Sequence, residues 1–107
     1  MKVKMIDVLY YYDGPQVVLL YLEHKKYLLC IAVNKEAYSW PMFCVFIDEK
    51  YIDQDVDLFD IFNEAKEYFF IDYSNIKLDK DITLIKATKE ESKDLDYWPT
   101  PGFIFTI

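Results

Sequence analysis

Closely spaced carboxylates between residues 53 and 64 come nearest, in this sequence, to a metal-binding pattern. Asp53, Asp55 and Asp57 alternate along the chain, and Glu64 stands at the twelfth position counted from Asp53. Carboxylate oxygens at these places would suit a calcium-binding loop. The sixth residue of such a loop must be glycine for its sharp turn, but here it is Leu58, which belongs to the apolar stripe of a predicted helix. We therefore expect no metal site and interpret these carboxylates as the acidic start of a helix.

Histidine and cysteine offer little for nucleophilic catalysis. His24 is the only histidine, so a two-histidine metal site and a second imidazole base are excluded. We expect His24 to be exposed in a polar hairpin turn. Cys30 and Cys44 stand in apolar runs without Cys-x-x-Cys spacing or a neighbouring histidine, which favours two reduced core thiols over a disulfide, a metal pair or a cysteine nucleophile.

The remaining residues carry no pattern typical of an enzyme. The two glycines, Gly14 and Gly102, each stand beside a proline, so the chain has no glycine-rich phosphate loop. Carboxylates are numerous, but no two of them are marked as a general acid and base. We expect no catalytic residue and no cofactor.

Charge is distributed unevenly along the chain. The sequence has 19 acidic residues, 12 lysines and no arginine, for a net charge of −7. Residues 1–47 hold five Lys and four Asp or Glu, whereas residues 48–107 hold seven Lys and fifteen Asp or Glu. This balance disfavours direct binding to nucleic acid or to an anionic membrane. It favours a basic protein partner, although the acidity could equally serve to keep an apolar chain in solution.

Aromatic side chains stand among these acids. Tyr10, Tyr11 and Tyr12 are consecutive in a predicted strand, so at least one ring should be exposed. Tyr51, Tyr68 and Tyr73 are either interface residues or rings that pack across strands. The segment 94–99 combines two acids, two aromatics and a proline, and is either a binding loop or a lid that packs Trp98 on the sheet. The candidate partner-binding residues are Asp53, Asp55, Asp60, Glu64, Asp72, Asp94, Asp96, Tyr97 and Trp98.

Strands are the main elements that must position these residues. Apolar and alternating runs predict strands at 3–11, 16–22, 27–33, 42–47, 67–73, 82–87 and 103–107. The second and third are apolar on both faces and should lie centrally, covered on both sides. In the first, we expect Val3, Met5 and Leu9 on one face and Lys4 and Ile6 on the other. Polar turns are expected at 13–15 and 23–26, and a loop at 34–41.

One main helix is predicted at about 57–66. Leu58, Ile61, Phe62, Ala65 and Phe69 follow helical spacing, and Asp57 is a good N-cap. Residues 89–96 are predicted to form a charged loop or helical turn. The order of elements predicts an α+β fold: one domain over residues 1–107, with a mostly antiparallel, twisted sheet of six or seven short strands and the helix on one face. Four consecutive meander strands make a strongly bent sheet or half-barrel compatible with this order.

Neither a secretion signal nor a membrane span is expected. The first residues lead directly into a strand-like run, and no apolar stretch reaches the ~18 residues that a membrane span needs. The prediction is a cytoplasmic protein.

Part of the chain resembles a group of small, functionally uncharacterised bacterial proteins. The likeness covers about residues 7–66 and rests on Tyr12-Asp13-Gly14-Pro15 before an apolar strand, on Tyr27-Leu28 after a polar turn, and on Asp57-Leu58-x-x-x-Phe62. Where the group has a glycine in the turn, this chain has Lys25-Lys26. The resemblance implies a strand-meander fold and a bacterial or phage source, and it carries no catalytic residues across.

These observations favour a binding protein over an enzyme. The first hypothesis is an inhibitor of the immunity, antitoxin or anti-defence type, which occludes a basic surface on a toxin, a nuclease or a nucleic-acid-binding protein. The second is a structural accessory subunit or homodimer that pairs edge strands and whose acidity serves solubility. The charge excess begins at Asp48, so the second half of the chain is where a working surface is expected.

Overall fold

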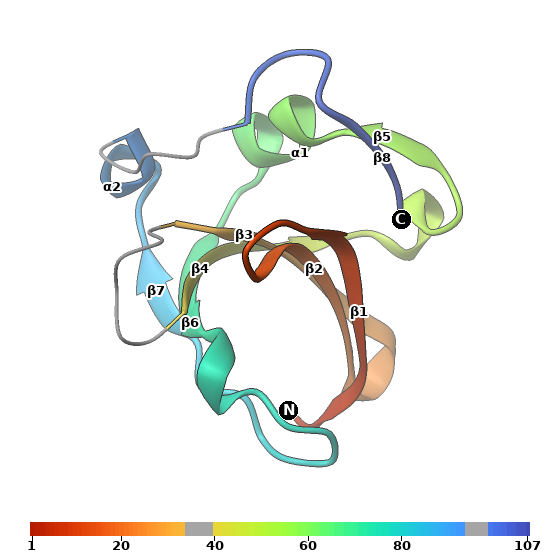
Figure 1. Ribbon diagram of the computed structural model, residues 1–107, viewed down its shortest axis with the longest axis vertical. Helices are drawn as coiled ribbons and strands as arrows, with labels where there is room; N and C mark the ends of the chain where they lie inside the picture. The colour runs from red at the N-terminus through yellow and green to blue at the C-terminus, as the bar shows by residue number, and fades with distance from the viewer. Residues whose placement is uncertain (34–39, 94–98) are drawn as a thin grey trace.

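The apolar runs of the first half of the chain form four consecutive antiparallel strands. In the computed structural model, which describes residues 1–33, 40–93 and 99–107, they belong to a six-stranded sheet of order β1-β2-β3-β4-β6-β7, and β5 and β8 form a second sheet (Figure 1). The strands are β1 Val3–Tyr11, β2 Pro15–Leu22, β3 Lys26–Ala32, β4 Pro41–Ile47, β5 Asp55–Asp57, β6 Tyr68–Asp72, β7 Ile85–Ala87 and β8 Ile104–Thr106. The helices are α1 Leu58–Glu64 and α2 Lys89–Lys93, and short 3-10 turns are η1 Glu23–Lys25, η2 Glu49–Tyr51 and η3 Tyr73–Asn75. The predicted α+β fold with one main helix is confirmed.

The central strands are buried on both faces, as their composition predicts. Val17 and Leu19 of β2 belong to a core that also contains Leu58 and Phe62 of α1, here called the helix-side core. Val18 and Leu20 alternate with them and belong to a second core, here called the loop-side core. Figure 1 shows α1, β5 and β8 on one side of the sheet and the segment from η3 to β7 on the other. Two covering layers explain why β2 and β3 carry no polar face.

The expected facing of β1 is wrong. Val3 and Ile6 both pack into the loop-side core, whereas Leu9 packs against the helix-side core. Register shifts between Val3 and Met5 and again between Val8 and Tyr10 mark irregularities in the pairing of β1 with β2. An extra residue at such a bulge reverses which face the following side chains occupy, so simple alternation along β1 fails.

The main helix begins as predicted and ends earlier. The Asp57 side chain accepts a hydrogen bond from Phe59 N at 3.0 Å, which is the expected N-cap. Leu58 and Phe62 are fully buried. Ala65 has an extended backbone, so the helix stops at Glu64, and Phe69 lies in β6 rather than on the helical stripe.

A short antiparallel pair, β5 with β8, was not predicted. The residues before α1 were interpreted only as the acidic start of the helix, but Asp55, Val56 and Asp57 pair with Thr106, Phe105 and Ile104. Val56 is buried, and Leu58 N donates to Phe103 O at 3.0 Å. The pair therefore brings the end of the chain back over the sheet, next to α1.

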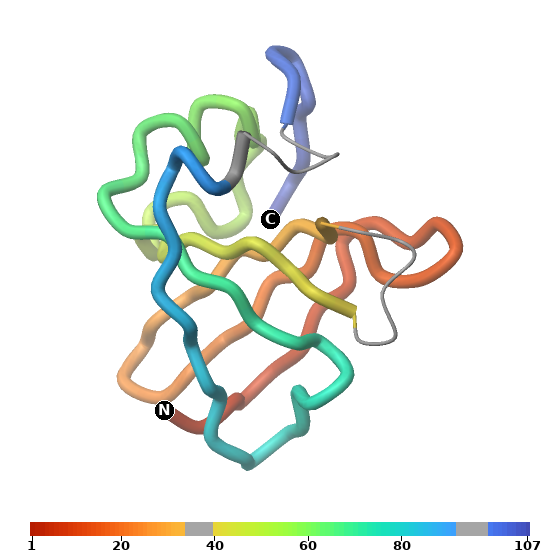
Figure 2. Tube along the Cα trace, turned by 90° about the vertical axis from the view of Figure 1, so that its left-hand side faces the viewer, coloured from red at the N-terminus to blue at the C-terminus, as the bar shows by residue number. Residues whose placement is uncertain are grey.

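Figure 1 shows that the sheet is strongly bent, but β1 and β7 are its two edges, so it is not closed into a barrel. The segment between η3 and β7 reaches back to the start of β1, where Lys2 bridges Asp81, Val3 N donates to Lys80 O and Asp79 N donates to Val3 O. Both ribbon and tube views show this segment passing beside the N-terminus (Figure 1, Figure 2). Within the described ranges, no helix is long and apolar enough to cross a membrane.

Candidate protein-interaction surface

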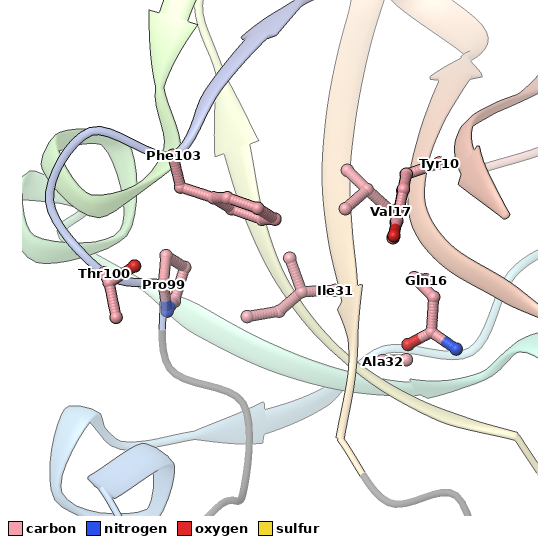
Figure 3. Close-up of a pocket in the computed structure, with 8 residues that line it drawn as sticks. All are labelled: Tyr10, Gln16, Val17, Ile31, Ala32, Pro99, Thr100 and Phe103. Carbon is pink, nitrogen blue, oxygen red and sulfur yellow. The ribbon is translucent and has the colours of Figure 1, made fainter. Parts of the chain in front are cut away.

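An apolar pocket of about 170 Å³ lies between the sheet and the segment 99–103. Val17 of β2 and Ile31 and Ala32 of β3 line it from the sheet, and Figure 3 shows Pro99 and Phe103 on the opposite side. Tyr10 of β1 lines the edge. Gln16 and Thr100 are the polar members. The pocket is thus mostly apolar with a few polar groups, which is the usual composition of a binding pocket.

Exposed aromatic and aliphatic side chains line this pocket or stand next to its lining residues in the sequence. Tyr11 and Tyr12 are 71% and 60% exposed, and Tyr10, Phe103 and Ile104 are also exposed. These five residues are here called the aromatic rim. The prediction of at least one exposed ring in the tyrosine triplet is confirmed. Tyr10 and Phe103 line the pocket itself, and exposed apolar side chains that lie together are a feature of interaction sites.

Ring contacts link the two strands that carry the aromatic rim. The Tyr10 ring meets the Phe105 ring edge-on at 6.1 Å between centroids, and Phe105 meets Phe103 at 4.9 Å. Such edge-to-face contacts stabilise the relative position of aromatic rings. The end of β1 and the strand β8 are therefore held as one surface.

The turn between β1 and β2 is fixed next to the pocket. Gln16 Nε2 donates to Tyr12 O at 2.6 Å, and Trp40 Nε1 donates to Pro15 O at 2.6 Å. Gly14 has a φ of +120° and lies under the Trp40 ring, where a Cβ would come within 2.7 Å of the indole. Both the conformation and the space require glycine at this position.

Asp57 fixes the other wall of the pocket. One of its carboxylate oxygens caps α1, and the other accepts a hydrogen bond from Gly102 N at 2.9 Å. The start of the helix and the segment that carries Phe103 therefore share one carboxylate.

Five carboxylates follow one another on the segment 53–64, here called the acidic segment. Asp53, Asp55, Asp60 and Glu64 are exposed, and Asp57 is half-buried. Asp55 accepts from the Thr106 hydroxyl, Asp60 lies in the first turn of α1, and Glu64 is its last residue. Four of the predicted partner-binding residues are thus brought together on β5, α1 and the turn before them.

The other predicted partner-binding residues are not part of this group. Asp72 lies at the end of β6, on the side of the sheet away from α1, where its carboxylate accepts hydrogen bonds from the Ser74 backbone, the Ser74 hydroxyl and the Asn75 amide. Local capping accounts for this residue. Asp94, Asp96, Tyr97 and Trp98 lie outside the described residues.

Three tyrosines that were candidates for an interface pack inside the domain. Tyr68 is buried, stacks on Phe43 at 5.2 Å and donates its hydroxyl to Phe62 O. Tyr73 is half-buried against the loop-side core and Tyr51 against the helix-side core. Burial raises the pKa of Tyr68 and the pKa of Tyr73 above the ordinary value. Cross-strand and core packing therefore explains these rings.

The two thiols lie inside the fold, away from the one histidine of the sequence. Cys30 and Cys44 are free and buried, and His24 is exposed in the turn between β2 and β3. Leu58, the residue at the glycine position of a calcium loop, is fully buried at the start of α1. In the part of the chain that the structure describes, no group of three or more His, Cys, Asp or Glu side chains could hold a metal ion.

Sequence reasoning missed the pocket and the contribution of the C-terminal residues. Tyr10, Val17, Ile31 and Phe103 come from four separate strands or segments, and no spacing along the chain connects them. The only signal was the run Tyr10-Tyr11-Tyr12, which predicts exposed aromatic surface. Comparisons of the chain with protein-family models, with curated proteins and with solved structures found no match. The resemblance to small bacterial proteins stays a prediction.

Proposed function

We propose that this protein is a small acidic protein-binding module that occludes a basic surface of a partner protein. The observation that carries the proposal is the aromatic rim with its pocket, set in chain segments that carry acidic residues and no basic ones. Residues 5–22, 31–32, 51–65 and 99–107 build the rim, the pocket lining and the acidic segment. They contain Asp7, Asp13, Asp53, Asp55, Asp57, Asp60 and Glu64 and not a single lysine.

The acidic residues elsewhere in the described chain differ from those of the acidic segment because several of them form ion pairs. Among the described residues, Asp79 pairs with Lys4, Asp81 with the N-terminal amine and Glu67 with Lys86. Within the same ranges, no ion pair involves the acidic segment. Carboxylates left in water beside apolar surface attract a basic partner over a distance and then orient it, while the apolar contact supplies most of the affinity.

Partner and mechanism follow from this surface chemistry. A toxin, a nuclease or another nucleic-acid-binding protein presents clustered Lys and Arg, which the acidic segment can neutralise. The action is steric and electrostatic occlusion, without catalysis, and belongs to the inhibitor, immunity or anti-defence type. A cytoplasmic location and a bacterial or phage source are part of the proposal, since such partners act on nucleic acid in cells.

Charge neutralisation in matched variants tests the proposal. The immobilised chain is used to isolate a partner from the cells that encode it, and the purified partner is then titrated against two variants. One is Asp53→Asn/Asp60→Asn/Glu64→Gln; the control is Glu67→Gln/Asp79→Asn/Asp81→Asn, which changes the net charge equally. We expect affinity to fall about tenfold in the first and less than about threefold in the control, with steep weakening by salt. An equal loss of affinity in the two variants, or an affinity that does not change with salt concentration, would contradict the proposal.

A homodimer or structural subunit is the second candidate, and the edge strand β1 favours it. β1 ends the sheet, and Met5 and Val8 on it are each 40% exposed. Exposed apolar edge strands can pair with a second copy. Light scattering separates the two candidates, because a dimer has twice the mass of one chain and persists at high salt.

A further inference from the structure

We infer that the pocket between β1–β3 and the segment 99–103 receives one leucine- or phenylalanine-sized side chain of the partner, presented beside lysine or arginine. This inference rests on the proposed function and names the partner's contact. The occupant is a basic protein segment with one apolar anchor.

Size selects the anchor. The volume of about 170 Å³ is close to that of an apolar cavity of roughly 150 Å³ that holds benzene. An aliphatic or single-ring side chain therefore fills the pocket, whereas alanine leaves most of it empty. Binding hot spots of protein interfaces are side chains of this kind in desolvated pockets, surrounded by a rim that excludes water. Tyr10 and Phe103 of the aromatic rim line the pocket and supply part of that surrounding surface.

Polar groups at the pocket suit a peptide backbone. Gln16 uses Nε2 to donate to Tyr12 O, which leaves its Oε1 as an acceptor, and Thr100 contributes a hydroxyl (Figure 3). An N–H of the incoming segment can donate to either oxygen once its side chain is inserted. Neither group carries charge, so the pocket itself selects an apolar side chain.

Charge selects the residues on either side of the anchor. The segments that line the pocket and its rim carry Asp7 and Asp13 on β1 and the following turn, and the acidic segment pairs with β8 directly after Phe103. The lysines of β1 and β3, Lys4 and Lys26, stand at the ends of these strands away from Tyr10 and Ile31. An acidic flank on the partner would therefore be repelled at the pocket and a basic flank attracted. An apolar side chain with Lys or Arg neighbours is the complementary chemistry.

Peptide probes test the inference on the full chain. The probes are blocked pentapeptides, Gly-Lys-Leu-Lys-Gly, its Leu→Ala form, its Leu→Phe form and its form with both lysines replaced by Glu. Nuclear magnetic resonance titration should move the signals of Val17, Ile31 and Phe103. We expect the Leu and Phe probes to bind about tenfold more tightly than the Ala probe, because each buried carbon adds affinity. The Glu-flanked probe should bind most weakly.

Two Thr→Trp variants test whether the preference for Leu over Ala arises in the pocket. Thr100→Trp places an indole at the exposed mouth of the pocket and should abolish the preference for Leu over Ala. Thr83→Trp is the control, since Thr83 is exposed between β6 and β7, and it should leave the preference intact. A preference that survives Thr100→Trp would overturn the inference.

The outcomes separate the pocket from the proposed function. If the Lys-flanked probe binds more tightly than the Glu-flanked probe but the Leu and Ala probes bind equally, the proposed basic partner is supported and the apolar anchor in the pocket is contradicted. If the Leu probe binds more tightly than the Ala probe but the Lys-flanked and Glu-flanked probes bind equally, the apolar anchor is supported and the basic partner is contradicted. Contacts between the Trp98 ring and Ile31 in the unbound chain, or shifts at Ile31 that grow with protein concentration alone, would show another occupant and overturn the inference.

Discussion

Cys30 on β3 lies directly opposite Cys44 on β4, and both side chains are fully buried in the loop-side core. Each thiol donates a weak hydrogen bond to the backbone carbonyl oxygen two residues earlier. Cys30 Sγ lies 3.9 Å from Leu28 O, and Cys44 Sγ lies 3.7 Å from Met42 O. Burial raises the pKa of Cys44 well above its ordinary value, and a hydrogen bond with Cys30 adds to the shift.

We predict that neither thiol reacts in the folded protein. Only the thiolate is a good nucleophile, and burial suppresses both its formation and the approach of a reagent. A chromogenic disulfide reagent at pH 8 should release no colour from the native chain within minutes, and two equivalents per chain after denaturation in guanidinium. Rapid modification without denaturant would show that β3 and β4 open locally.

Replacement of Asp57 should cost more stability than replacement of any other member of the acidic segment. Asp57→Ala removes the N-cap of α1 and the acceptor for Gly102 N, each worth about 1 kcal/mol, so we expect about 2 kcal/mol of lost unfolding free energy. Asp57→Asn keeps an acceptor for the cap and should lose less. Asp60→Ala, exposed in the same helix, should change stability by less than about 0.5 kcal/mol. Urea unfolding monitored by circular dichroism gives the three values, and equal losses would remove Asp57 from this role.

The two glycines allow backbone strain to be separated from steric conflict. Both have positive φ, +120° at Gly14 and +85° at Gly102, but an added Cβ meets the Trp40 ring only at Gly14. Gly102→Ala should cost about 1 kcal/mol from conformation alone, and Gly14→Ala roughly 2 to 4 kcal/mol because Trp40 must also move. Tryptophan fluorescence should shift in Gly14→Ala only. If the two variants unfold at the same urea concentration, the contact with Trp40 has no energetic weight.

Much of the fold could be predicted because its strands carry strong local signals. The runs that became β2, β3 and β4 are apolar on both faces, and Asp57 followed by a helical stripe marks the start of α1. Strand β5 could not be predicted, since three residues with one buried side chain, Val56, give no period. The bulge that reverses the facing of β1 has no sequence signal either, because it depends on the pairing with β2.

Less of the candidate site was predictable, because it depends on contacts between residues far apart in the sequence. The two hydrogen bonds of Asp57 illustrate this. Its local bond to Phe59 N follows from helix capping, whereas its bond to Gly102, 45 residues away, exists only after β5 and β8 pair. That second bond, together with the bond from Leu58 N to Phe103 O, holds the segment that lies across the pocket from Ile31. Composition alone indicated the acidic segment and the exposed tyrosines. It could not indicate that Tyr10 and Phe103 would lie beside one another.

Buried tyrosines make the stability of the fold sensitive to alkaline pH. The pKa of Tyr68 is raised above the ordinary value of 10.0 by burial, so in the folded state its hydroxyl keeps its proton when the unfolded chain begins to lose it. The folded state then binds more protons than the unfolded state, and stability falls as pH rises above about 10. Burial raises the pKa of Tyr73 in the same direction.

Tyr68→Phe should make this alkaline loss of stability smaller. At pH 7 the variant should lose about 1 kcal/mol, since Phe62 O loses its hydroxyl donor. Between pH 9 and pH 11 its urea midpoint should fall less steeply than that of the parent chain, because one group with a raised pKa has been removed. Tyr11→Phe is the matched control, since Tyr11 is 71% exposed and should leave both the midpoint at pH 7 and the slope unchanged. Parallel pH profiles for the parent and Tyr68→Phe would mean that Tyr68 ionises as readily in the folded chain as in the unfolded one.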